Sequence, residues 1–298
     1  MHSRKFALVA VFLVQLLYGL NYTFAKIVIN ENYIKPSGFV LLRVIGATVL
    51  FWVFGLFLKS ETIERKDLFK FFIAAVFGVA TNMLLFFKGL ELTSPIHASV
   101  IMITVPIIIM VFSSFFLKEK ITWLKGLGVL LGFVGAVILT LYGKSNRVGD
   151  NVLLGNLFVF INAISYSIYI ILIKKLTAKY HPFTFIKWLF LFGTFMVLPF
   201  GYNELREVDW QSFTPYITFS VVFVIIGATF ATYILNPLAL TKLKASTVGT
   251  FIYLQPVIAG LFAIVMGVDT VNVVKIIAMF LIFGGVYLVS FKPKIKST

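Results

Sequence analysis

Ten apolar stretches, each long enough to cross a lipid bilayer as a helix, follow one another along this 298-residue chain. A helix needs about 20 predominantly apolar residues to span the hydrocarbon core. Only residues 201–212 form a linker that we expect to hold more than a turn. The pattern predicts an all-α integral membrane protein of ten transmembrane helices, with spans at 6–29, 37–58, 68–89, 94–117, 122–142, 152–176, 182–200, 213–237, 245–268 and 271–291.

The composition agrees with a lipid environment and excludes several classes of protein. Hydrophobic residues make up 60% of the chain and charged residues only 12%, whereas soluble domains carry about 25% charged residues. The net charge of +15 comes from Lys and Arg that lie mostly in short loops, so it indicates membrane topology rather than nucleic-acid binding. The chain has no Cys, which excludes disulfides and Cys-ligated metals.

The distribution of Lys and Arg predicts the orientation in the membrane. With the N-terminus inside, 17 of the 26 basic residues fall on the cytoplasmic side and 7 on the other side. Cytoplasmic loops carry such an excess in membrane proteins. The basic start resembles a signal peptide, but its apolar run continues to about Ile29 without a cleavage site. We therefore expect a multi-pass protein of the inner (plasma) membrane with both termini in the cytoplasm.

The two halves of the sequence repeat each other at an offset of 150 residues, which drifts to 148 near the start. Pro106 corresponds to Pro256, and each lies within an apolar stretch. Because each half contains an odd number of spans, the second half must enter the membrane from the opposite side. We expect two inverted five-helix repeats, at residues 1–145 and 146–298. Inverted repeats are typical of alternating-access carriers, which hold the substrate near the midplane.

A series of short motifs occurs in order over nearly the whole chain: Tyr18-Gly19-Leu20-Asn21, Arg43, 89–94 leading to Pro106, 117–120, and 239–240 leading to Pro256. This series resembles the EamA-type members of the drug/metabolite transporter superfamily. The resemblance implies that the chain transports a small organic solute, such as an amino acid, another metabolite or a drug, without naming it. The chain departs from the family at Tyr18, where Trp is commoner, and at residues 267–270.

Polar side chains recur at helical spacing within several spans. A buried amide or hydroxyl costs a few kcal/mol without a hydrogen-bond partner, so these side chains should face protein or water rather than lipid. One interpretation is a central cavity that binds the solute; the other is hydrogen bonding between helices. The candidate substrate-binding residues are Gln15, Tyr18, Asn21, Tyr22, Arg43, Asn82, Asn162, Tyr166, Tyr169, Tyr233, Asn236, Tyr253 and Gln255.

Three further features bear on mechanism. Proline inside a helix removes a backbone hydrogen bond and bends the helix, so Pro106 and Pro256 are either paired hinges or static kinks. Arg43 is an intramembrane cation with no carboxylate in a span, which leaves helix-end carbonyls or an anionic group of the solute as its partner. Gly128 and Gly132 form a G-x-x-x-G pattern that favours close helix packing, within the chain or at a dimer seam.

An intramembrane enzyme or a channel is the alternative function. The sequence contains no recognisable catalytic motif, and its three histidines are scattered. We therefore expect no enzyme activity, no cofactor and no metal. The expected partners are a small-molecule solute and the lipid bilayer, with the chain acting as a monomer or a weak homodimer.

Overall fold

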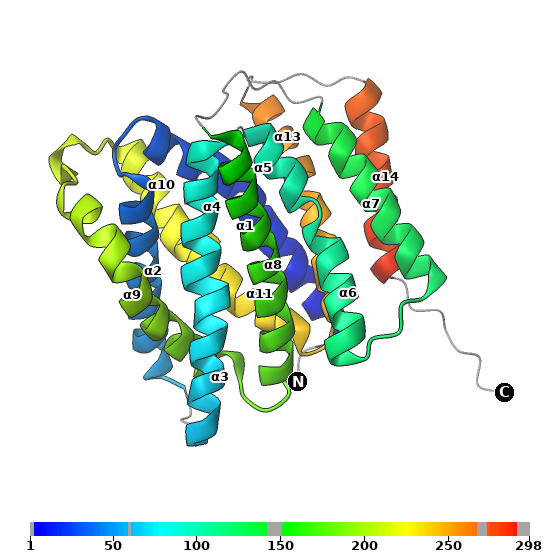
Figure 1. Cartoon of the computed structure of the whole chain (residues 1–298), viewed down its shortest axis with the longest axis horizontal. Helices are drawn as coiled ribbons and strands as arrows, with labels where there is room; N and C mark the ends of the chain where they lie inside the picture. Colours follow the sequence, from blue (N-terminus) through cyan, green and yellow to red (C-terminus); the bar gives the residue numbers. More distant parts are fainter. Residues whose placement is uncertain (1–2, 59–60, 94, 142–150, 267–272, 291–298) are drawn as a thin grey trace.

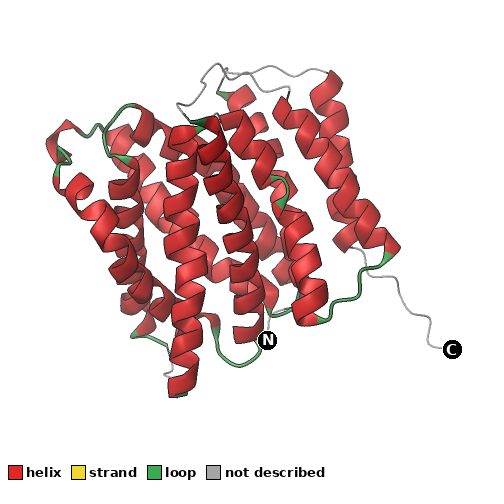
Figure 2. Ribbon diagram, in the orientation of Figure 1, coloured by secondary structure: helices red, strands yellow, loops and turns green. Residues whose placement is uncertain are grey.

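Every regular element in the described residues is a helix, as the computed structural model shows (Figure 1 and Figure 2). Nine helical segments among these residues are long and apolar enough to cross a membrane, and a tenth at Trp123–Ile138 is apolar but shorter. The prediction of an all-α membrane protein with ten transmembrane helices is confirmed. The structure describes residues 3–58, 61–93, 95–141, 151–266 and 273–290.

The first half contains five passes, two of which are interrupted. The third pass contains a short π-helix, η1, and the fourth pass is divided into two α-helices. The elements are α1 (Arg4–Asn30), α2 (Pro36–Gly55), α3 (Arg65–Ala75), η1 (Val76–Ala80), α4 (Thr81–Leu92), α5 (Pro95–Met102), α6 (Val105–Leu117) and α7 (Trp123–Leu141).

The second half repeats this order, including both interruptions. Its third pass contains the π-helix η3, and its fourth pass is divided by the 3-10 turn η4. The elements are α8 (Val152–Leu176), α9 (Pro182–Arg206), η2 (Trp210–Ser212), α10 (Pro215–Ile225), η3 (Ile226–Ala231), α11 (Thr232–Leu240), α12 (Ala245–Thr250), η4 (Phe251–Tyr253), α13 (Leu254–Val265) and α14 (Val273–Ser290).

The prediction of a linker at residues 201–212 is wrong for its first half, residues 201–206. Helix α9 continues as far as Arg206, and a 3-10 turn follows at Trp210–Ser212. The extension is anchored at Gly201, where an added Cβ atom would lie 2.5 Å from the Ser37 carbonyl oxygen of α2. This close contact between helices holds polar residues in a helical conformation that their composition does not predict.

We expected both prolines to lie inside continuous helices, and this prediction is wrong. Pro106 is the second residue of α6, and Pro256 is the third residue of α13. In the first turn of a helix the missing N–H of proline costs no hydrogen bond. Each pass is therefore interrupted before its proline, at residues 103–104 and 251–253.

Helices from the two halves pack against one another throughout the molecule. Helix α2 lies along α9, α7 along α14, α4 along α8, and α1 against α11 and α13 (Figure 1). At the α7–α14 contact, a Cβ atom added to Gly128 would lie 2.7 Å from the Gly285 carbonyl oxygen. The G-x-x-x-G pattern of α7 therefore serves packing within the chain.

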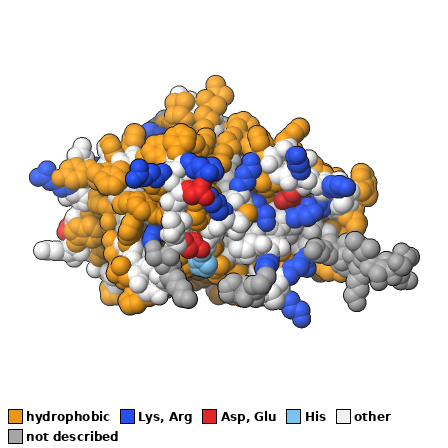
Figure 3. Space-filling model, turned by 90° about the horizontal axis from the view of Figure 1, so that it is seen from below, with side chains coloured by type: hydrophobic (Ala, Val, Ile, Leu, Met, Phe, Trp, Pro, Cys, Tyr) orange, Lys and Arg blue, Asp and Glu red, His pale blue; other side chains and the backbone are white. Residues whose placement is uncertain are grey.

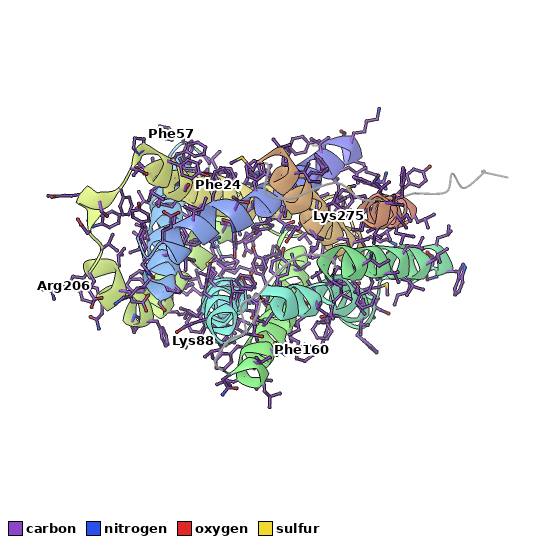
Figure 4. All side chains as sticks on the ribbon, turned by 90° about the horizontal axis from the view of Figure 1, so that it is seen from above. Phe24, Phe57, Lys88, Phe160, Arg206 and Lys275 are labelled. Atoms are coloured by element: carbon purple, nitrogen blue, oxygen red, sulfur yellow. The ribbon has the colours of Figure 1, made fainter. Side chains whose placement is uncertain are left out.

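The outer surface of the bundle is apolar, as a lipid-facing surface requires. Phe57 and Phe280 are 82% and 74% exposed, and Phe57, Phe160 and Arg206 lie at the rim of the molecule when it is seen from above (Figure 4). The view from below shows Lys and Arg side chains spread over one end, with a few acidic side chains among them (Figure 3). The apolar band and the charged end match a protein that spans a bilayer.

The start of α1 and the end of α14 lie at the same end of the bundle. The Arg4 guanidinium donates a hydrogen bond to the Ser290 carbonyl oxygen. Ten passes bring the chain back to the side on which it began, whereas five passes do not. This contact therefore agrees with an even number of passes.

Candidate functional site

Four tyrosines from three different passes meet near the middle of the bundle. The ring centroids of Tyr166 and Tyr169, both on α8, are 6.0 Å apart, and those of Tyr169 and Tyr233 on α11 are 5.7 Å apart. Tyr18 of α1 lies within electrostatic range of all three and interacts with the side chain of Thr232. We call Tyr18, Tyr166, Tyr169 and Tyr233 the tyrosine cluster.

The tyrosine cluster is hydrogen-bonded to the π-helix η1 of the first half and to Asn236 of the second half. The Tyr233 hydroxyl donates to the Gly78 carbonyl oxygen of η1 over 2.6 Å. The Asn236 amide donates to the Tyr166 hydroxyl over 3.1 Å. A π-turn leaves a backbone carbonyl free for such a bond, and π-turns inside α-helices frequently mark functional sites.

Asn82 and Asn162 meet beside the cluster, although only the backbone of Asn82 takes part. The Asn162 amide donates to the Asn82 carbonyl oxygen over 2.5 Å. This bond joins α8 to α4 just beyond the π-helix η1.

Arg43 of α2 lies next to the cluster and is almost completely buried, with 6% of its surface exposed. Its Nε donates to Thr229 Oγ1 of η3 over 3.0 Å, and Tyr18 and Tyr233 are its electrostatic neighbours. Thr229 in turn donates to the Val224 carbonyl oxygen five residues earlier, over 2.8 Å. The π-helix therefore sets the position of the hydroxyl that holds Arg43.

Gln15, three residues before Tyr18 on α1, meets Gln255 of the second half. Gln255 Nε2 of α13 donates to Gln15 Oε1 over 2.7 Å. The ring of Tyr253 lies against Gly132 of α7, where an added Cβ atom would be 2.3 Å from the ring. The side chain of Asn21 is described, whereas that of Tyr22 lies outside the described residues.

Unsatisfied polar atoms concentrate on these predicted residues. Among the described residues, nine buried side-chain nitrogen or oxygen atoms have no hydrogen-bond partner, and six of the nine belong to the candidate set. Native proteins satisfy nearly all buried polar groups, so each such atom calls for water or a ligand. The six atoms are Gln15 Nε2, Asn21 Oδ1, Asn162 Oδ1, Tyr169 Oη, Asn236 Oδ1 and Tyr253 Oη.

A contact that the sequence did not reveal joins the two divided passes at the end of the bundle that holds Ser290. The Glu119 carboxylate, after α6, accepts hydrogen bonds from the Ala245 amide over 2.7 Å and from Ser246 Oγ over 2.6 Å. Lys125 Nζ lies 3.5 Å from the same carboxylate and donates to Ser246 Oγ. We call these contacts the Glu119 latch. Glu119 follows an apolar run, and this position gives no sign of its distant partner.

The same end of the bundle carries a second ionic network, between the 56–64 and 177–181 loops. Lys179 donates to Glu64 and to the buried Asp67, and Tyr180 donates to Asp67 over 2.7 Å. The hydrogen bond from Lys179 lowers the pKa of the Glu64 carboxyl. Hydrogen bonds to Asp67 and Glu64 raise the pKa of Lys179.

Potential metal ligands are scattered in the described part of the chain. No group of three or more His, Asp or Glu residues there is arranged to hold a metal ion.

The architecture is that of a membrane transporter, with inverted halves around a buried polar centre. The model of the EamA-like transporter family matches residues 5–141 and 153–291. The chain belongs to this family of membrane transporters and is not an enzyme.

Relatives and a solved structure agree with the family. An uncharacterized transporter of Archaeoglobus fulgidus is 26% identical over 272 residues, which is 91% of this chain and 94% of that protein. The uncharacterized transporter YetK of Bacillus subtilis is 22% identical over 281 residues, or 93% and 84% of the two chains. A solved crystal structure matches with a TM-score of 0.79 at 18% identity and covers 96% of both chains, which supports the fold alone.

Proposed function

We propose that this transporter carries a small organic solute, an amino acid or a related metabolite, out of the cell by alternating access. The solute would bind at the tyrosine cluster and the polar residues around it. The observation that carries this proposal is the set of six unpartnered buried polar atoms on residues predicted from the sequence alone. Hydrogen bonds between helices would have satisfied these atoms, whereas a solute-binding site leaves them free.

The depth of the site supports transport across the membrane. Both π-helices lie near the middle of their passes, between α3 and α4 and between α10 and α11. Carriers built from inverted repeats hold their substrate near the midplane, where discontinuous helices expose backbone groups. The interruptions before Pro106 and Pro256 are the proposed hinges, and residues 1–145 and 146–298 are the proposed inverted five-helix repeats.

The Glu119 latch would close one end of the pathway in this conformation. Since the latch lies at the end that holds Arg4 and Ser290, the charge distribution makes it the cytoplasmic end. We therefore expect both termini in the cytoplasm and a binding site that communicates with the outside in this state. The chain would work as a monomer or a weak homodimer.

Solute counterflow in proteoliposomes tests the proposal. Vesicles are loaded with one unlabelled amino acid or metabolite at a time, and uptake of the labelled form is followed. A carrier gives transient accumulation above the external concentration, whereas a channel only equilibrates the label. The Tyr18→Phe and Asn236→Ala variants should exchange more slowly than the wild type.

Tyr202→Phe is the matched control, because Tyr202 is 54% exposed at the end of α9. Equilibration without overshoot for every solute would favour a channel. Equal exchange by the wild type and both site variants would remove the tyrosine cluster from the pathway.

A further inference from the structure

We propose that the transported solute carries a carboxylate and that Arg43 recognises it. The inference rests on the proposed function, and it specifies the chemical class of the solute.

Arg43 is held in place by one edge of its guanidinium group. Nε donates to Thr229 Oγ1 over 3.0 Å, and Thr229 is fixed by its own bond to the Val224 carbonyl oxygen. Among the described residues, neither Nη group of Arg43 donates to a protein acceptor, and no carboxylate forms an ion pair with it. A buried charge that lacks a counter-ion is unfavourable, so an anionic partner from outside the chain would stabilise it.

The second repeat shows that the fold does not need this charge. Helices α2 and α9 both begin at a proline, Pro36 and Pro182, so Arg43 in the eighth position of α2 corresponds to Leu189 of α9. Thr229 of η3 corresponds to Val79 of η1, at the offset of 150 residues. Leu189 and Val79 are both fully buried, and a Cβ atom added to Gly193 of α9 would be 2.5 Å from Val79 Cγ1 of η1. The same junction between a π-helix and its neighbouring pass is therefore built once with apolar residues and once with Arg43 and Thr229. Helix packing explains the apolar junction between α9 and η1, but it does not explain the charge of Arg43 at the junction between α2 and η3.

The geometry left to Arg43 suits a carboxylate. Guanidinium groups bind carboxylates through two parallel N–H···O bonds, and the two free Nη groups retain this capacity. The hydroxyl groups of the neighbouring Tyr18 and Tyr233 lie within electrostatic range of the guanidinium. Asn236 Oδ1 and Asn162 Oδ1, both buried acceptors without a partner in the described structure, suit a donor group such as an amine elsewhere on the same solute.

The charge of the site favours a monoanion over a phosphate ester. Among the described residues, Arg43 is the one cation within electrostatic range of the Tyr18 and Tyr233 hydroxyl groups. A phosphate monoester carries a charge of about −1.5 to −2 at neutral pH and would need a second cation. One guanidinium balances one carboxylate.

Ligand-induced thermal stabilisation of the purified protein provides the test. The probes are leucine, phenylalanine and glutamine, together with the primary amides of the same three amino acids. Each amide keeps the amine and the side chain but lacks the carboxylate. Sodium chloride and inorganic phosphate at matched ionic strength form a third arm, which detects binding of a simple anion.

We expect at least one acid to raise the melting temperature of the wild type, and its amide to require at least about tenfold higher concentration, the factor that one charge-assisted bond supplies. Arg43→Gln should remove this preference, and Arg43→Lys should restore part of it. Arg206→Gln, at the exposed end of α9, should keep the full preference.

Three results would overturn the inference: equal stabilisation by acid and amide, no stabilisation by any acid, or the same stabilisation by chloride or phosphate alone. If Arg43→Gln does not fold, the acid and amide comparison on the wild type still decides. Counterflow separates the two proposals. Exchange of acids and amides at equal rates by the wild type would leave a carrier without carboxylate recognition, whereas absence of any exchange would refute the proposed function itself.

Discussion

The ring of Tyr169 lies directly against the backbone of Gly78, so that a Cβ atom added to Gly78 would be 2.2 Å from the Cδ2 atom of the ring. Gly78 belongs to the π-helix η1 of the first half, and Tyr169 belongs to α8 of the second half. The missing side chain allows the tyrosine cluster to reach the interrupted pass. Gly78 also provides the carbonyl oxygen that accepts the hydrogen bond from Tyr233.

Replacing Gly78 by Ala should displace Tyr169. Overpacking of a tight contact typically costs about 1–3 kcal/mol, so the melting temperature should fall and the affinity for the solute should fall with it. The matched control is Gly126→Ala in α7, where an added Cβ atom meets nothing within 4 Å. That change should be neutral or slightly stabilising, since Ala is a better helix former than Gly. Equal melting temperatures for the two variants would contradict the close contact at Gly78.

The arrangement of the passes could be predicted from the sequence because hydrophobic length is a local property. Residues 152–176 were expected as a span, and α8 covers Val152–Leu176. The offset of 150 residues also relates η1 to η3, although no local signal predicted either π-helix. A π-turn depends on contacts such as that of Gly78 with Tyr169, which join residues far apart in the sequence.

The composition of the polar centre was predictable, but its hydrogen bonds were not. The helical spacing of Tyr166 and Tyr169 indicated a shared face, and the structure places their rings together. That Thr229 holds Arg43 could not be inferred, because the pairing depends on how α2 crosses η3. The Glu119 latch was missed for the same reason, since its two sides are 126 and 127 residues apart in the chain.

Tyr169 and Tyr233 should respond differently to loss of the hydroxyl group. The Tyr169 hydroxyl is buried without a partner among the described residues, so Tyr169→Phe should leave the melting temperature unchanged or raise it. Tyr233→Phe loses the bond to Gly78 and should lower stability by about 0.5–1.5 kcal/mol. Thermal unfolding measures both effects, and counterflow measures transport.

Solute exchange should be slower in Tyr169→Phe despite its undiminished stability. This combination separates a binding role from hydrogen bonding between helices. A clear loss of stability in Tyr169→Phe, with transport falling only in proportion, would assign the hydroxyl to helix packing instead.

The Glu119 latch should control access from the end of the bundle that holds Ser290. The chain has no native Cys, so a single Cys at Thr247, a buried position of α12, can be labelled without background. Glu119→Ala removes the hydrogen bonds to Ala245 and Ser246 and should increase the rate of maleimide labelling by about tenfold or more, since a bond to a charged group contributes about 1.5–3 kcal/mol.

The control for the latch is Glu91→Ala. Glu91 forms an exposed ion pair with Lys88 on α4, remote in the chain from α12, and its loss should leave the labelling rate unchanged. Labelling that does not respond to Glu119→Ala would show that other contacts keep this end closed.

The ion pair between Glu64 and Lys179 should make the stability of the protein fall at acid pH. The folded-state pKa of Glu64 is below its ordinary value of 4.5, because Lys179 donates to the carboxylate. A lowered carboxyl pKa stabilises the fold above pH 4.5, and this contribution is lost as the pH falls through the folded-state pKa. The raised pKa of Lys179 adds stability that is present below its ordinary value of 10.5 and is lost as the pH rises through the folded-state pKa.

Melting temperatures measured as a function of pH test this assignment. Glu64→Gln should melt below the wild type at pH 7, and the two curves should converge as the pH falls below 4.5. The control Glu31→Gln changes an exposed carboxyl that forms no ion pair in the described structure, and it should follow the wild type throughout. A difference between Glu64→Gln and the wild type that persists at acid pH would have a cause other than this ion pair.

The interruptions before Pro106 and Pro256 should set the speed of transport. An alanine at either position supplies the N–H that proline lacks, and this group can bond the carbonyl oxygen four residues earlier, in Met102 or Ile252. The two parts of the pass can then join into one helix, which straightens the proposed hinge. We expect Pro106→Ala and Pro256→Ala each to fold, to keep the ligand-induced thermal shift, and to exchange solute more slowly.

Pro199→Ala is the control, because Pro199 lies inside the continuous helix α9 and its replacement should leave the exchange rate near that of the wild type. Exchange at the wild-type rate by both hinge variants would mean that the interrupted passes are static features of the fold.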